Sequence, residues 1–147
     1  MRVILQRVTS ASVVIDDACV GQVGLGYLAL VGFTHDDTEA DIDYMVEKVK
    51  HLRVFSDDEG NMNRSLCDVH GSILSVSQFT LYADARKGRR PSFIQAMKPE
   101  QATQMYDLWN EKLRQVGIEV QTGIFGADMK VTLTNDGPVT ICLESRK

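Results

Sequence analysis

The sequence predicts a single α+β domain, residues 1–147, in which two main helices accompany a mostly antiparallel, curled β-sheet or barrel. Three observations support this fold class. Runs of β-branched and apolar residues occur near both ends of the chain, only two segments have helical periodicity, and 147 residues suit one core. No repeat, linker or low-complexity segment divides the sequence, so we expect one domain.

The first part of the chain predicts strands. Residues 3–8 and 11–15 are short runs rich in β-branched side chains, and Asp16 and Asp17 offer a turn directly after them. Residues 27–33 are almost wholly apolar, which is typical of a strand that is covered on both faces.

The first helix is predicted to begin after Thr38, because residues 38–41 have the pattern of a capping box that Asp41 closes. Apolar residues follow at helical spacing: Ile42, Met45, Val46 and Val49. Residues 52–55 then predict a strand, and the polar residues 56–61 predict a hairpin-like turn.

The second helix is predicted between Pro99, which favours a first turn, and Gly117, which favours a helix end. One apolar stripe runs along it: Ala102, Tyr106, Trp109, Leu113 and Val116. Three strand-like runs follow, at residues 118–121, 129–134 and 139–143. Residues 135–138, Asn-Asp-Gly-Pro, have strong turn chemistry and are expected to join the last two runs.

Composition excludes several classes of protein. The net charge of −4 argues against general binding along a DNA or RNA backbone, although Arg86-Lys87-Gly88-Arg89-Arg90 holds four of the sixteen Lys and Arg residues. No apolar run reaches the roughly 18 residues of a membrane helix. The first residues return to charge too soon for a signal peptide, so we expect a cytoplasmic protein without a membrane partner.

The common hydrolytic motifs are absent from the sequence. It has no G-x-S-x-G elbow, no H-E-x-x-H motif and no paired cysteines, and its three histidines lie far apart. We therefore expect no metal and no cofactor. The cysteines are odd in number and widely spaced, which disfavours a disulfide framework, and we expect each to be a small apolar filler: Cys19, Cys67 and Cys142.

Two segments are left unexplained by composition. In residues 75–84, Ser77, Gln78 and Thr80 surround Phe79 just before the basic run. This segment is either a strand edge with satisfied hydroxyls or a strand end that presents backbone N–H groups to a substrate ester. The second segment contains Gly137-Pro138, which on local chemistry alone is a plain turn.

At these two segments the sequence resembles the D-aminoacyl-tRNA deacylase family. The matching pieces are residues 77–81, Ser-Gln-Phe-Thr-Leu, and Gly137-Pro138, in the expected order and with flanks that match over essentially the full chain. The resemblance implies a hydrolase that cleaves the ester between a D-amino acid and tRNA and so proofreads chirality in translation. It also implies a symmetric homodimer whose active sites lie at the subunit interface.

The resemblance further implies how L-amino acids are rejected. The Gly137-Pro138 bond would be cis and would project into the neighbouring subunit's pocket, where its two carbonyls accept from the substrate ammonium group. No room would remain for a side chain on the L branch. Because this selection works by exclusion, we expect breadth across D-amino acids and cleavage of glycyl-tRNA as well.

The resemblance assigns catalysis to residues 77–80. Two accounts of the reaction stay open. Thr80 is either a nucleophile, which needs an activating base, or a neighbour of backbone N–H groups that polarise the ester carbonyl for attack by water. We favour the second account, in which the 2′-hydroxyl of the terminal ribose assists. Ser77 and Gln78 then shape the site and position the substrate.

Further residues are implied around the ester. Phe125 and Met129 are expected to line the pocket near the terminal adenosine, with Ala102 as another candidate. The tRNA phosphates would meet residues of the basic run, although a solvated loop fits that run equally well: Arg86, Lys87, Arg89 and Arg90.

Two other functions fit the same residues. A small-molecule esterase would cleave a free D-amino acid ester as fast as the tRNA ester. A non-enzymatic RNA-binding module would bind charged tRNA without turnover, although the low pI of about 5.3 disfavours it.

Overall fold

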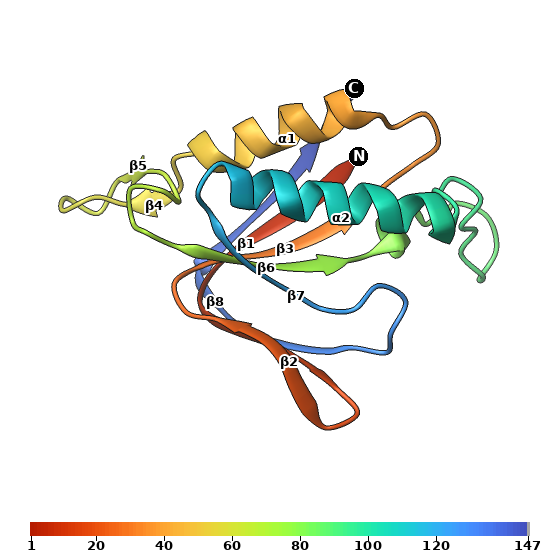
Figure 1. Cartoon of the computed structure of the whole chain (residues 1–147), viewed down its shortest axis with the longest axis horizontal. Helices are drawn as coiled ribbons and strands as arrows, with labels where there is room; N and C mark the ends of the chain where they lie inside the picture. The colour runs from red at the N-terminus through yellow and green to blue at the C-terminus, as the bar shows by residue number, and fades with distance from the viewer. Residues whose placement is uncertain (147) are drawn as a thin grey trace.

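A six-stranded sheet curls until it is nearly closed, and two helices lie side by side on its outer face (Figure 1). The computed structural model describes residues 1–146. Its elements are β1 (Arg2–Ile15), β2 (Ala18–Val23), β3 (Gly26–Gly32), α1 (Glu39–His51), β4 (Phe55–Ser56), β5 (Met62–Arg64), β6 (Ser72–Ser77), η1 (Phe79–Tyr82), α2 (Pro99–Gln115), β7 (Glu119–Thr122) and β8 (Lys130–Glu144). The predicted α+β class is confirmed.

The sheet contains both kinds of pairing. Strand β1 pairs antiparallel with β2, β3 and β8, whereas β3 pairs parallel with β6 and β6 parallel with β7. Parallel neighbours need a crossover connection. Helix α1 lies in the connection from β3 to β6 and α2 in the connection from β6 to β7, which explains why both helices lie outside the curl on the same face (Figure 1).

Two of the predicted strand boundaries were wrong. The runs at 3–8 and 11–15 form one continuous strand, β1, and the runs at 129–134 and 139–143 form another, β8. Residues 135–138 were predicted to be a hairpin turn but lie inside β8. Gln6 pairs with Thr140 and Val8 with Asn135, so residues 136–139 all lie opposite Arg7. The turn chemistry therefore produces a wide bulge, because β1 continues to pair with β8 on both sides of it.

Two smaller expectations also failed. Of residues 52–55, which were predicted to form a strand, only Phe55 belongs to one. The hairpin-like turn predicted after them does form, because β4 pairs antiparallel with β5 around residues 56–61. All three cysteines are free and exposed on this chain, so they are not apolar fillers of a core.

Both helices form as their sequence patterns predict. The capping box of α1 is present, with the Thr38 N–H donating to Asp41 Oδ2 at 2.8 Å. Helix α2 begins at Pro99, and Gly117, at φ +91°, follows its end. Their apolar faces cover a large core against the sheet, in which Trp109 and Leu113 are fully buried.

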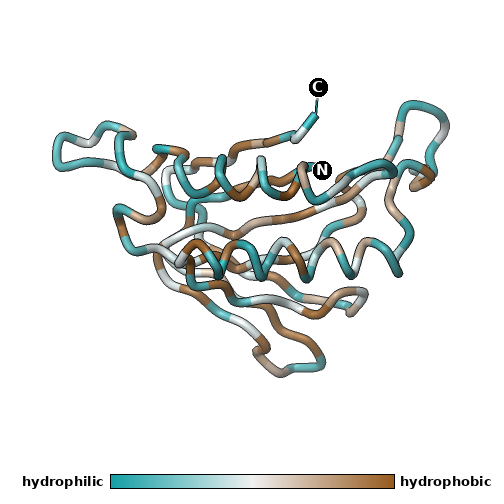
Figure 2. Tube along the Cα trace, turned by 45° about the horizontal axis from the view of Figure 1, so that its top comes forward, coloured by the Kyte–Doolittle hydropathy of each residue, from teal (hydrophilic) through white to brown (hydrophobic). Residues whose placement is uncertain are grey.

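A second, smaller core fills the inside of the curl. It contains residues of β1, β2, β3 and β6, among them Val8, Val13, Leu28 and Leu74. Because β3 contributes Tyr27 to the outer core and Leu28 to the inner one, it is buried on both faces as predicted. Apolar segments accordingly concentrate along the strands (Figure 2). No helix in residues 1–146 has the length and apolar character needed to cross a membrane.

Candidate functional site

A cavity of about 240 Å³ opens where β6 ends, beside the segment that leads into β8. Its lining includes five residues that were predicted for catalysis or substrate binding: Ser77, Gln78, Phe79, Phe125 and Met129. Residues far apart in the sequence thus meet at one site, whose inner end borders the small core through Val76 and Val131.

Strand β6 delivers the catalytic segment to this cavity. Its residues 73–76 are buried between β3 and β7, and the Gln78 N–H still donates to the Val31 carbonyl at 2.7 Å. The chain then turns into the single 3₁₀ turn η1. The N–H groups of Phe79 and Thr80 find no acceptor in residues 1–146, as expected for the first residues of such a turn.

The cavity wall carries no acid or base. In the described part of the chain its lining includes no His, Asp, Glu, Lys, Arg or Cys. Thr80 itself is exposed in η1, and its hydroxyl oxygen accepts a hydrogen bond from Gln78 Nε2. No group of three His, Cys, Asp or Glu side chains in residues 1–146 is arranged to hold a metal ion. The cavity lining therefore offers an amide donor and no side chain that could act as a general base.

Helix α2 supports the site from behind. The Tyr106 hydroxyl donates to the Ser75 carbonyl at 2.7 Å, and Trp109 Nε1 donates to Ser75 Oγ at 3.2 Å. Burial raises the pKa of Tyr106, and the contacts with Ser75 and Asn110 oppose this rise. The Tyr106 ring also lies 6.2 Å from that of Phe125, between centroids. The sequence predicted Tyr106 only as core, and its apolar stripe gave no sign of these polar contacts.

Four predicted residues do not line the cavity: Thr80, Ala102, Gly137 and Pro138. Ala102 is buried in the outer core beneath α2, and neither it nor Gly137 nor Pro138 lines the cavity. Gly137 and Pro138 are exposed on the bulge of β8, and the peptide bond between them is cis, as the family resemblance implies.

Arg7 holds the bulge, a role that the sequence analysis missed. Its side chain is almost fully buried, with Nη1 donating to the Val54 carbonyl at 2.6 Å and Nε to the Asp136 carbonyl at 3.1 Å. The Asp136 carboxylate lies 3.5 Å from the same Nε. The signal available was a cation between the apolar residues Leu5 and Val8 of a predicted strand, because a buried Arg needs partners.

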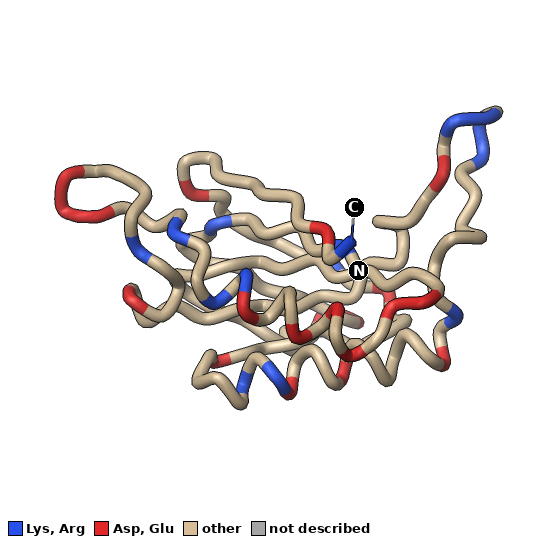
Figure 3. Tube along the Cα trace, turned by 90° about the horizontal axis from the view of Figure 1, so that it is seen from above, with Lys and Arg blue, Asp and Glu red and all other residues tan. Residues whose placement is uncertain are grey.

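The basic run occupies the tip of a loop that projects from the body of the protein beyond η1 (Figure 3). Arg86 pairs with Asp84 at 2.7 Å and lowers the pKa of that carboxyl to about 2, while the pKa of Arg86 is raised. Lys87, Arg89 and Arg90 are exposed and form no ion pair with a residue in 1–146. Three of the four predicted phosphate contacts are thus free to meet an anion.

Known proteins resemble this chain over its full length. The family model for D-Tyr-tRNA(Tyr) deacylase matches residues 4–144. A D-aminoacyl-tRNA deacylase of Bacillus pumilus (strain SAFR-032) is 56% identical over 147 residues, with 100% of both chains covered. One of Limosilactobacillus reuteri (strain DSM 20016) is 59% identical over 144 residues, which cover 98% of this chain and 99% of the relative.

Two solved structures have the same fold. A protein described as the c-Myc DNA Unwinding Element Binding Protein superposes with a TM-score of 0.95 at 41% identity, with both chains fully covered. A probable eukaryotic D-amino acid tRNA deacylase superposes with a TM-score of 0.84 at 21% identity, covering 97% of this chain and 98% of its own.

Proposed function

Because this chain belongs to the D-Tyr-tRNA(Tyr) deacylase family, we propose that it hydrolyses the ester bond between a D-amino acid and tRNA. The products are the free D-amino acid and tRNA. The observation that carries the assignment to this cavity is the unpaired N–H group of Phe79, which lines it, followed directly by the unpaired N–H group of Thr80. They are donors of the kind that stabilises the oxyanion formed when an ester is attacked.

In the proposed reaction water attacks the ester carbonyl carbon. The carbonyl oxygen takes up negative charge opposite the Phe79 and Thr80 amides, and the bond to the ribose oxygen then breaks. The neighbouring ribose 2′-hydroxyl assists proton transfer to that oxygen, which makes RNA and not DNA the substrate. Thr80 is no nucleophile in this scheme, because an activating base is needed and none lines the cavity in residues 1–146.

We propose that Gly137-Pro138 selects against L-amino acids from the neighbouring copy of a homodimer. Both residues are exposed and lie away from the cavity of their own chain, so a second copy is needed to bring them to it. Strand β8 supports this arrangement, since within residues 1–146 it pairs with β1 alone and its other edge is open. The inserted backbone would exclude an L side chain, whereas glycyl-tRNA, which has none, would be cleaved.

Around the ester, Phe125 and Met129 are proposed to contact the terminal adenosine, and Ser77 and Gln78 to shape the pocket. The exposed cations at the tip of the basic loop would meet tRNA phosphates outside it. Arg86 contributes less, because Asp84 neutralises it.

The test compares release of amino acid from matched D-tyrosyl-tRNA and L-tyrosyl-tRNA, with a chelator present. We expect rapid loss of the D ester while the L ester stays intact. Cleavage of both esters would refute the exclusion mechanism, and cleavage of neither would refute the proposed reaction. Glycyl-tRNA provides the third arm, and inertness toward it would contradict selection by exclusion alone.

A further inference from the structure

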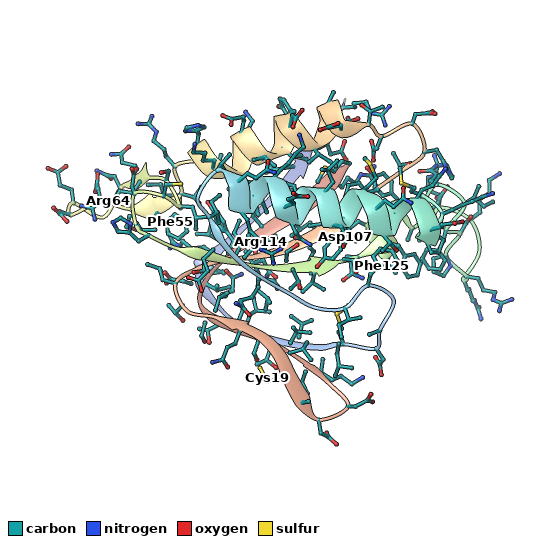
Figure 4. The ribbon with its side chains drawn as sticks, viewed as in Figure 1. Cys19, Phe55, Arg64, Asp107, Arg114 and Phe125 are labelled. Carbon is teal, nitrogen blue, oxygen red and sulfur yellow. The ribbon has the colours of Figure 1, made fainter. Side chains whose placement is uncertain are left out.

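A second groove, of about 630 Å³, runs along α2 on the other side of Phe125. It lies between one face of α2 and residues 122–125, and Phe125 borders both this groove and the catalytic cavity. Figure 4 shows Asp107 and Arg114 along α2, with Phe125 on the segment below the helix. A substrate that extends beyond the cavity past Phe125 would therefore enter this groove.

The floor of the groove contains a polar atom without a partner. Asn110 is 4% exposed, and its Oδ1 accepts no hydrogen bond from any residue in 1–146. An unsatisfied buried carbonyl oxygen is costly, and an N–H donor that reached it from the groove would relieve this cost. Asp107 and Glu111 add two carboxylate acceptors beside it.

The remaining groups in the groove suit a flat, partly apolar ligand. Ile124, which is 55% exposed, and Phe125 provide apolar surface on the side opposite α2. Arg114 is the one cation that the described residues contribute to the groove, and its Nη2 donates to the Val120 carbonyl at 3.0 Å. An exocyclic amino group on an aromatic ring would satisfy Asn110 and pack on this apolar side.

We propose that this groove binds the nucleobase that immediately precedes the terminal adenosine of the substrate tRNA. The inference rests on the proposed function, which places the ester and the adenosine in the adjoining cavity. All tRNAs end in C-C-A, so the base is a cytosine, whose N4 amino group donates to acceptors such as Asn110 Oδ1 and Asp107. The base turns into the groove while its phosphate stays in solvent, away from the carboxylates.

The test uses short substrates in place of tRNA: D-tyrosyl esters of adenosine, of the dinucleotide CpA and of UpA. Uracil replaces the amino donor of cytosine with a carbonyl acceptor. We expect kcat/KM for the CpA ester to exceed that for the adenosine ester by about tenfold, within the range of one stacked base and one hydrogen bond. The UpA ester should gain less than about a third of this advantage, and an equal gain would overturn the proposal.

Variants then assign the gain to the groove. In Asn110→Leu and in Asp107→Leu the ratio of kcat/KM for CpA and adenosine esters should fall toward one, whereas Asn110→Asp, which keeps an acceptor, should retain it. Because the ratio is taken within each variant, a general loss of activity cancels. Glu100→Gln removes a carboxylate from α2 outside the groove and serves as the matched control.

The outcomes separate the two proposals. Cleavage of the adenosine ester without a cytosine gain, or a gain that persists in both leucine variants, would refute the groove and leave the deacylase assignment standing. Failure to cleave D-tyrosyl-tRNA itself would refute the reaction on which the groove depends.

Discussion

Replacing Gly137 with alanine tests the bulge of β8 both as a structure and as a selector. Gly137 has φ +125°, a region that residues with a side chain rarely adopt. A Cβ there would lie 2.9 Å from Val139 Cγ2, 3.0 Å from Arg7 Nη2 and 3.2 Å from the Val139 nitrogen. The nitrogen belongs to the backbone, and Arg7 is held by the carbonyls of Val54 and Asp136, so little of this crowding can relax.

The expected loss of stability is the sum of a backbone part and a steric part. The backbone part costs about 1–2 kcal/mol and the contacts about 1–2 kcal/mol more, so the free energy of unfolding should fall by about 2–4 kcal/mol. In a chain of this size that corresponds to a fall in Tm of about 5–15 °C, measured by circular dichroism. Gly60→Ala is the control, because φ is +82° there and no atom lies within 4 Å of the added Cβ. In Gly60→Ala the free energy of unfolding should fall only by the backbone part, about 1–2 kcal/mol.

The same variant tests the selection mechanism. Gly137 does not line the cavity of its own chain, so a chain that works alone should keep its preference for D substrates. We expect the ratio of D-tyrosyl-tRNA to L-tyrosyl-tRNA hydrolysis to fall at least about tenfold, because the displaced backbone no longer excludes the L side chain. An unchanged Tm would refute the steric reasoning. An unchanged ratio in a destabilised but folded variant would refute the role of the bulge.

Three further changes probe the cavity and the basic loop. Thr80→Ala should keep hydrolysis of D-tyrosyl-tRNA within about tenfold of the native rate, and a loss beyond about a thousandfold would restore Thr80 as nucleophile. Arg86 lowers the pKa of Asp84 from 3.8 to about 2. The stabilisation from this ion pair is therefore fully present above about pH 4 and is lost as the pH falls through about 2. A carboxyl titration by NMR should show this midpoint, and Arg86→Gln should return it toward 3.8; an unmoved midpoint would contradict the pairing. In Arg89→Gln/Arg90→Gln the plot of log affinity for tRNA against log salt should become shallower by about 1.5, and an unaltered slope would mean that this loop contacts no phosphate.

The sequence predicted those elements whose signals are local. The capping box at Thr38 and the apolar stripe that includes Trp109 depend on neighbours within one or two helical turns, and both helices form where these signals lie. The apolar run at 27–33 likewise identified a strand covered on both faces. Such elements can be predicted because neighbouring residues alone carry their signals.

Features that depend on distant partners were missed. The turn residues at 135–138 occur in many hairpins, and only their pairing with the far end of the chain, at Gln6 and Val8, makes them a bulge. The same limit applies to Arg7, whose acceptors come from Val54 and Asp136. No local pattern could reveal that partnership.

The candidate site was predicted in part. The family resemblance selected residues 77–80 together with Phe125 and Met129, and the fold brings Ser77, Phe125 and Met129 to one cavity. The expectation of backbone N–H groups beside Thr80 also came from the sequence, and the structure adds why those of Phe79 and Thr80 lack acceptors, which is that β6 ends just before them. The sequence could not reveal the Asn110 carbonyl, which is unpaired only in the context of the folded groove.

The offset between β1 and β8 has a consequence for how this protein can evolve. From Gln6 to Ser10 strand β1 advances four residues, while β8 advances six from Thr134 to Thr140. The difference is even, so the odd-numbered side chains of β8 are the half-buried ones on both sides of the bulge, with Val131 and Leu133 packed against the inner core and Ile141 and Leu143 against the outer one. A lineage that gains or loses two residues in the bulge of β8 can remodel it and keep both cores. A change of one residue would instead move the half-buried side chains on one side of the bulge to the solvent face. The length of the bulge can therefore change during evolution only in steps of two residues.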